Sequence, residues 1–134
     1  MAALTADRNT QRKPGELLPF KLAAGVKIFA GAMVCANASG FAVPGSTAAT
    51  LTYLGRAEET VDNTDGADGA LYVITRRKQA FLWANDGADP VTQASIGKPC
   101  YVVDDQTVAA THNSNARSLA GTVLAVDASG VWVE

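Results

Sequence analysis

The C-terminal stretch Leu119-Ala-Gly-Thr-Val-Leu-Ala-Val-Asp-Ala-Ser-Gly-Val-Trp-Val-Glu134 decides the fold. Apolar residues dominate both of its halves, and Asp127-Ala-Ser-Gly130 between them is rich in turn formers. β-Branched and aromatic residues on either side of a short polar turn are typical of a β-hairpin. The stretch therefore predicts strands over 119–126 and 131–134, joined by a turn.

Runs of the same kind recur along the rest of the chain, separated by clusters of Gly, Asn, Asp and Ser. Pro19 cannot donate to a strand ladder and predicts an edge strand or a strand start, and Gly55 predicts a bulge or close packing. Short strands at this spacing predict an all-β fold, either a small β-barrel or a β-sandwich. We expect the strands within Leu17–Leu22, Val26–Phe29, Ala32–Ala36, Phe41–Val43, Leu51–Val61, Leu71–Ala84, Cys100–Val103 and Thr107–Ala110, with Leu71–Ala84 the longest.

Residues 1–15 differ from the rest because they are polar and show no apolar period. We expect them to form an extended N-terminal arm that orders only against a partner. Residues 16–134 show neither a structural repeat nor a boundary between two cores, so they are predicted to form a single β domain. A chain of 134 residues is of the size of one such domain.

Charge and hydropathy together argue against two classes of partner. The chain has 11 Lys and Arg against 13 Asp and Glu, a net charge of −2. Nucleic-acid binding normally requires clustered basic residues, so we expect no nucleic-acid partner. Neither an apolar run of about 18 residues nor a basic start followed by an apolar segment appears, so no membrane span and no secretory signal is expected.

Residues that could carry chemistry lie in polar loops. His112, the single histidine, has Asn and Ser neighbours and lacks a nucleophile motif. Asp62, Asp65 and Asp68 do not match the spacing of a calcium loop. Asp104 and Asp105 are adjacent and predict a turn. We therefore expect no enzyme activity, no catalytic residues, no cofactor and no metal.

The two cysteines, Cys35 and Cys100, lie in apolar stretches and are expected to be buried, reduced thiols. The sequence leaves open whether they pair as a disulfide. Two cysteines and one histidine form a poor zinc set, because structural zinc sites use four ligands.

The candidate contact residues are basic, with one aromatic residue among them. The run Arg76-Arg77-Lys78 is either a solvated, salt-bridged segment or a contact to an acidic subunit surface. The arm, with Arg8, Arg12 and Lys13, is either a mobile tail or a segment that docks onto a neighbour. Phe20 follows the arm directly. The predicted capsid or intersubunit contacts are Arg8, Arg12, Lys13, Phe20, Arg76, Arg77 and Lys78.

The sequence resembles the small decoration, or cement, proteins of tailed-bacteriophage capsids. Three features carry the resemblance, and the last forty or so residues match best. The first is the polar arm that leads into Leu18-Pro19-Phe20-Lys21 and Gly25-Val26. The second is Gly55-Arg56-Ala57, followed by an acidic Gly-rich loop and Leu71–Trp83. The third is the C-terminal stretch Ile96-Gly-Lys-Pro-Cys-Tyr-Val-Val-Asp-Asp-Gln-Thr-Val108, then Arg117, Leu119–Val123 and Val131–Val133. The basic run Arg76–Lys78 departs from many such proteins.

The resemblance implies a subunit, often trimeric, that sits on the outer capsid surface over threefold positions and bridges major-capsid subunits. The implied partners are the major capsid protein and two further copies of the chain. The implied location is the virion, after synthesis in the host cytoplasm. The alternatives are another virion part, such as a tail or head-completion protein, and a carbohydrate-binding domain that stacks sugars on Trp83 or Trp132.

Overall fold

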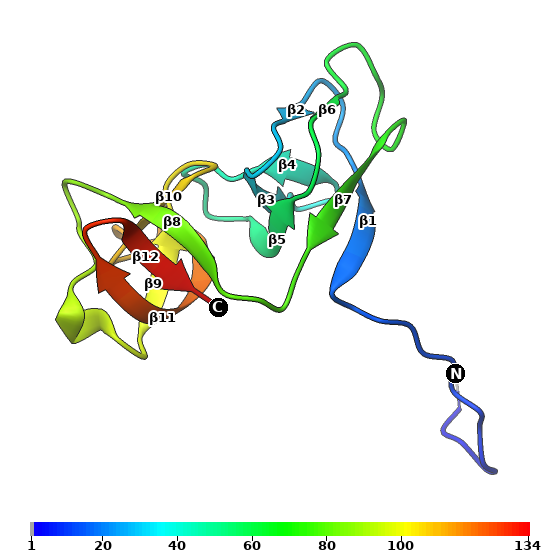
Figure 1. Cartoon of the computed structure of the whole chain (residues 1–134). Coiled ribbons are helices and arrows are strands. Elements are labelled where there is room, and N and C mark those ends of the chain that lie inside the picture. Colours follow the sequence, from blue (N-terminus) through cyan, green and yellow to red (C-terminus); the bar gives the residue numbers. More distant parts are fainter. Residues whose placement is uncertain (1) are drawn as a thin grey trace.

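The computed structural model describes residues 2–134 and is all-β, as the sequence predicts, with one short 3₁₀ turn, η1 (Gln93–Ser95). Figure 1 shows two lobes side by side and an arm that extends away from both. The strands are β1 (Leu17–Lys21), β2 (Lys27–Ile28), β3 (Met33–Ala36), β4 (Ala42–Pro44), β5 (Thr52–Ala57), β6 (Val61–Asp62), β7 (Tyr72–Arg76), β8 (Phe81–Asn85), β9 (Pro99–Val102), β10 (Thr107–Ala109), β11 (Leu119–Asp127) and β12 (Gly130–Val133).

The sheet lobe consists of β1 to β7. Its main sheet has the antiparallel order β1-β7-β5-β3-β4, with β2 and β6 paired separately. Strand β1 is an edge strand, which confirms the prediction from Pro19. Arg77 N donates to Glu16 O at 2.7 Å and Leu22 N donates to Leu71 O at 2.9 Å. In an antiparallel pair every second residue bonds the partner strand, so the even-numbered residues of β1 face β7 and the backbone of Pro19 faces outward.

The other edge of the sheet, β4, is protected in the same way. Gly45 N donates to Met33 O at 2.9 Å and Asn37 N to Phe41 O at 2.8 Å, so Ala42 and Pro44 face outward. Ala42 O already accepts a bond from Ala23 N at 3.0 Å, and Pro44 has no N–H to offer. Proline on a free edge hinders pairing with another strand.

The barrel lobe consists of β8 to β12, closed in the order β10-β8-β12-β11-β9. Strands β11 and β12 form the predicted hairpin, with Asp127 paired to Gly130 across the turn. The barrel closes through a parallel pairing of β8 with β10. Closure leaves this lobe without a free strand edge.

Two hydrophobic clusters fill the molecule, where the sequence shows no sign of two cores, and β3 contributes to both. Met33 and Cys35 belong to the barrel cluster with Phe81, Trp83, Val91, Cys100, Val102, Val108, Ala120, Val123, Val131 and Val133. Val34, between them, belongs to the sheet cluster with Leu22, Ile28, Ala32, Ala42, Ala57 and Val73. Successive side chains of a strand point to opposite faces, so β3 is covered on both.

Hydrogen bonds also join the lobes. Met33 N donates to Asp105 O at 2.7 Å, and Thr47 Oγ1 donates to Val103 O at 2.8 Å. The buried Ser118 hydroxyl accepts from Leu51 N at 2.9 Å and donates to Ala48 O at 2.6 Å. The shared strand and these bonds fasten the sheet to the barrel.

One expected strand is divided in the structure. Leu71–Ala84 was predicted as the longest strand, but it forms β7 and β8 in different lobes, and the nine-residue β11 is longest. Lys78 has φ +58°, where a β ladder cannot continue, so the chain turns from the sheet into the barrel there. The expected strand Leu51–Val61 likewise divides into β5 and β6.

Gly55 lies at the predicted irregularity in β5. The β3–β5 register shifts between Val34 and Cys35, opposite Gly55 and Tyr53. Gly55 has φ +152°, and a Cβ there would lie 2.1 Å from Arg76 O. Only glycine therefore allows β5 to approach the end of β7 at this point.

Candidate interaction surface

The basic run Arg76-Arg77-Lys78 does not form one patch, because neighbouring side chains on a strand point to opposite faces. Arg77 lies on the face of Phe20, with its guanidinium 5.9 Å from the ring centroid. Its Nη1 donates to Gly15 O at 3.3 Å, and its backbone N donates to Glu16 O at 2.7 Å. We call Gly15, Glu16, Phe20 and Arg77 the arm anchor, because they fix the base of the arm to β7.

Lys78 is exposed and follows Arg77 of the arm anchor in the chain. A Cβ on Gly15 would come within 2.9 Å of Lys78 Nζ, so the lysine side chain lies against the base of the arm. Of the predicted contact residues, the structure therefore brings together Phe20, Arg77 and Lys78.

Arg76 lies on the opposite face of the sheet, where it meets a residue that sequence reasoning missed. Arg56 of β5 pairs directly with Arg76 of β7. Glu58 accepts from both, from Arg56 Nη2 at 2.5 Å and from Arg76 Nε at 3.4 Å. We call these three residues the junction cluster. The Arg56 and Arg76 hydrogen bonds hold the pKa of Glu58 below its usual range.

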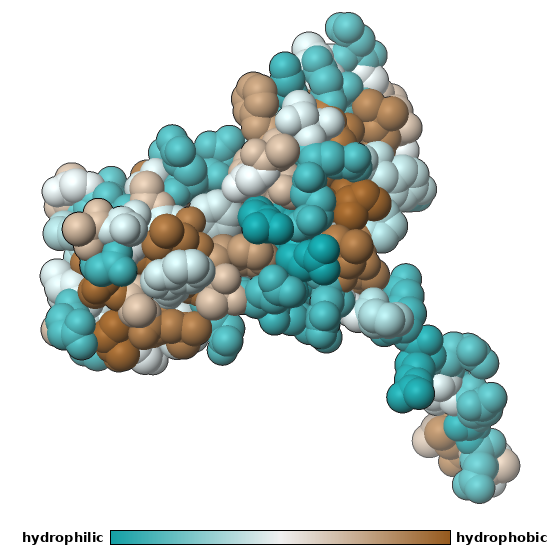
Figure 2. All heavy atoms as spheres, in the orientation of Figure 1, coloured by the Kyte–Doolittle hydropathy of each residue, from teal (hydrophilic) through white to brown (hydrophobic). Residues whose placement is uncertain are grey.

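The junction cluster has an excess of positive charge. Like charges directly opposite on neighbouring strands destabilise a sheet, and here two arginines share one carboxylate. Within residues 2–134, no other carboxylate lies within ion-pair distance of Arg56 or Arg76. In Figure 2 strongly hydrophilic side chains gather between the lobes, with hydrophobic ones on either side. This arrangement suits the binding of a further carboxylate.

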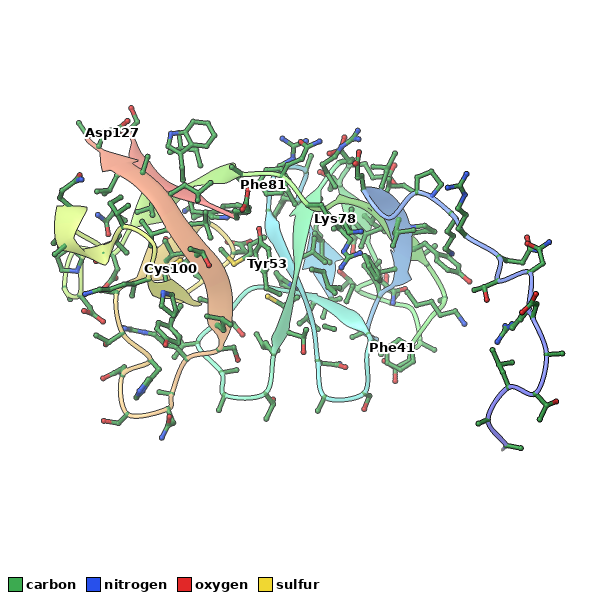
Figure 3. The ribbon with its side chains drawn as sticks, turned by 90° about the horizontal axis from the view of Figure 1, so that it is seen from below. Phe41, Tyr53, Lys78, Phe81, Cys100 and Asp127 are labelled. Carbon is green, nitrogen blue, oxygen red and sulfur yellow. The ribbon has the colours of Figure 1, made fainter. Side chains whose placement is uncertain are left out.

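Arg8, Arg12 and Lys13 are exposed on the arm and are not joined to either group. Among the described residues, 2–14 form no hydrogen bond or ion pair with the body, and Thr10 N bonds only to Arg8 O. Leu4 near the tip is 70% exposed. In Figures 1 and 3 the arm extends from the sheet lobe away from the barrel. The arm thus presents its side chains entirely to the surroundings.

An exposed apolar stripe crosses the barrel next to the junction cluster. Leu82 of β8 and Trp132 of β12 are directly opposite each other, and Ala125 of β11 is opposite Trp132. Leu82 is 40% and Trp132 38% exposed, and Leu124 in the bulge of β11 is 43% exposed. The signal in the sequence was the alternation Phe81-Leu82-Trp83, in which Leu82 has the outward parity.

The two tryptophans differ in access. Trp83 is only 4% exposed and lies in the barrel core, so it cannot stack on a sugar ring from solvent. Trp132 lies on the outer face of the barrel. The sugar platform considered for Trp83 is therefore wrong, and Trp132 is the tryptophan that remains accessible.

Both cysteines are buried and free, as expected. Burial raises the pKa of Cys35 to about 12 and that of Cys100 to about 11. Both thiols therefore stay protonated at neutral pH, which makes them poor nucleophiles. Figure 3 shows Cys100 inside the barrel lobe and Tyr53 between the lobes.

The polar loops use their side chains to hold backbone groups of the same loop or of another loop. His112 Nδ1 accepts from Asn115 N at 2.9 Å, and Asp68 Oδ1 accepts from Ala24 N at 2.7 Å. Asp62 accepts from Thr64, whose hydrogen bonds lower the pKa of that carboxyl. In the described part of the chain, no three His, Cys, Asp or Glu side chains are grouped to hold a metal ion.

Comparison with protein-family models, curated proteins and solved structures finds no match. Within residues 2–134, no helix has the length and apolar character needed to cross a membrane.

Proposed function

We propose that the protein is a capsid decoration protein of a tailed bacteriophage, which binds the outer capsid surface, bridges major-capsid subunits and stabilises the head. The observation that carries the proposal is the combination of a firmly joined β body with an arm that contacts nothing beyond its base. Extended segments of this kind gain order when they bind a partner.

The charge of the arm supports a docking role. Residues 2–14 carry Arg8, Arg12 and Lys13 against the single carboxylate Asp7. Because none of these cations is paired within the described chain, each is available to a carboxylate on a partner. The arm anchor fixes where the arm leaves the body, which limits the entropy lost on docking.

The body supports the same role through its edges and shape. The barrel is closed, and Pro19 and Pro44 occupy outward positions on the two sheet edges. A body of this kind resists uncontrolled strand pairing and contacts a shell through side chains. On this proposal the protein is a homotrimer, since three linked contacts bind far more tightly than one.

The direct test is to mix the purified protein with capsids that lack their decoration and image them by electron cryomicroscopy. We expect added density on the outer capsid surface. A variant in which Arg8, Arg12 and Lys13 are all changed to Gln should bind about tenfold more weakly, because each exposed ion pair contributes up to about 1 kcal/mol.

Deletion of residues 2–14 should weaken attachment further and leave the body folded. A Lys98→Gln variant, changed on the barrel lobe, is the matched control and should bind as the natural protein does. A complete absence of added density would refute the proposal. Rings or tubes formed by the protein alone would instead favour a tail or head-completion role.

A further inference from the structure

A groove of about 290 Å³ lies at the junction of the two lobes. One wall is cationic and comes from Arg56 of the sheet lobe. Apolar lining comes from the directly paired Leu82 and Trp132 of the barrel. The volume of the groove is at the lower end of the range for small-molecule sites, about 300–1,000 Å³, and is enough to admit side chains of a partner.

The cationic wall is held in place before any partner arrives. The Arg56 guanidinium lies 5.0 Å from the centroid of the buried Phe81 ring, and its Nη2 binds Glu58. Arg76, which pairs with Arg56 across the strands, donates to the same Glu58 carboxylate. Stacking on the ring fixes the plane of the Arg56 guanidinium, while 40% of the side chain stays open to solvent.

The junction cluster thus has two fixed cations and one carboxylate. A second carboxylate would relieve the repulsion between Arg56 and Arg76 and form charge-assisted hydrogen bonds with them. Leu82 and Trp132 offer apolar surface next to it, which favours a partner whose carboxylate adjoins a large apolar side chain. A nucleic acid also offers anions and stacking bases, but the net charge of −2 disfavours it as the partner.

We infer that this groove binds a peptide segment of a partner protein in which Glu or Asp is next to Leu or another large apolar residue. The carboxylate pairs with Arg56 in the groove and with Arg76 beside it, and the apolar side chain covers Leu82 and Trp132. The inference rests on the proposed function in one respect, because it assigns that segment to the capsid surface.

The test uses the full chain and a short fluorescein-labelled peptide of alternating Glu and Leu, with binding followed by fluorescence anisotropy. The matched peptide has Gln in place of Glu. We expect the Gln peptide to bind about tenfold or more weakly, since hydrogen bonds to a charged group are stronger than those to a neutral amide. Arg56→Gln, Arg76→Gln and Trp132→Ser should each weaken binding of the Glu peptide several-fold, and Lys98→Gln should leave it unchanged.

Three results of the binding measurements would overturn the inference, and one competition result would do the same. The binding results are equal binding of the Gln and Glu peptides, unchanged binding in all of the Arg56, Arg76 and Trp132 variants with native circular dichroism, and no binding of either peptide. Equal competition by a single-stranded oligonucleotide would mark a phosphate site and also refute it. Capsid attachment of the same variants is a separate readout. Peptide binding without capsid binding removes the proposed function alone, and capsid binding without peptide binding removes this inference alone.

Discussion

The barrel lobe and the sheet lobe solve the problem of strand edges in different ways. The barrel closes through the β8–β10 pairing and leaves no edge. The sheet ends in β1 and β4, which meet only at the isolated Leu22–Ala42 bridge and each have an outward-facing proline. The arm and most Lys and Arg residues lie on the sheet side and at the junction, and only Lys98 and Arg117 belong to the barrel lobe. On the proposed function, the sheet side and the junction contact the partner, and the far side of the barrel supports them.

Core truncations give the largest expected effect and test whether the two lobes are one cooperative unit. Trp83→Ala in the barrel core should lower the free energy of unfolding by about 3–5 kcal/mol, and Leu22→Ala in the sheet core by about 2–5 kcal/mol. Because β3 contributes to both clusters, each substitution should shift a single unfolding transition in urea, followed by tryptophan fluorescence and circular dichroism.

Leu124→Ala on the exposed barrel face is the control for these truncations and should change stability by less than about 0.5 kcal/mol. Two separate transitions, with only one shifted by each substitution, would show that the lobes unfold independently.

The joint between the lobes gives the next effect. Ser118→Ala removes the hydroxyl that bonds Leu51 N and Ala48 O and leaves both backbone groups without that partner. The expected loss is about 1–3 kcal/mol, measured by urea unfolding. Thr122→Ala, an exposed position in β11, is the matched control. Equal stability of the Ser118 and Thr122 variants would show that this link between the lobes contributes nothing.

Pro19→Val tests the edge protection of the sheet. The unfolded chain gains freedom without the proline, so stability should fall by no more than about 1 kcal/mol. The new outward N–H makes β1 a better template for another strand, so self-association at high concentration should rise. Sedimentation velocity measures the change, and Lys21→Val, at a neighbouring outward position, controls for added hydrophobicity. Unchanged association of the Pro19 variant relative to this control would refute edge protection.

The smallest effect concerns pH at the far end of the barrel. Asp89 accepts hydrogen bonds from Thr111 and from Arg117 Nη1, the latter at 2.8 Å. These hydrogen bonds, of which the one from the Thr111 hydroxyl has the largest effect, hold the pKa of Asp89 below its usual range. A lowered folded pKa stabilises the fold at neutral pH, and this contribution is lost as pH falls from about 5 through the folded value.

Asp89→Asn should therefore lower stability at pH 7 by up to about 1 kcal/mol and lose less stability than the natural protein on acidification. Urea unfolding at neutral and acidic pH provides the comparison. Asp127→Asn, at the hairpin tip, is the control. A difference between Asp89→Asn and the natural protein that stays constant with pH would contradict the assignment.

Local features of the fold could be predicted from sequence because each depends on neighbours in the chain. The Asp127–Gly130 hairpin, the edge position of Pro19 and the irregularity at Gly55 all follow from turn, proline and glycine chemistry. The division of Leu71–Ala84 could not be predicted, because it depends on which sheet each half joins. The parallel β8–β10 pairing that closes the barrel is likewise a long-range contact.

The candidate surface was predictable only in part, for the same reason. The sequence identified Arg76, Arg77 and Lys78 as a run but could not show that strand alternation sends Arg76 and Arg77 to opposite faces. Arg56 was missed, because its importance comes from pairing with Arg76, twenty positions further along the chain. The arm was predicted from its polarity alone, and the structure adds its anchor on Arg77 and Phe20.

Hydrogen exchange of the free and capsid-bound protein tests the central claim most directly, namely that the sheet side and the junction bind while the barrel supports. We predict that peptides covering residues 2–14, 56–58 and 76–83 gain protection on the capsid. The far barrel turns, residues 86–98 and 127–130, should exchange equally in both states. Protection confined to those turns, or no gain in the arm of bound protein, would contradict the account.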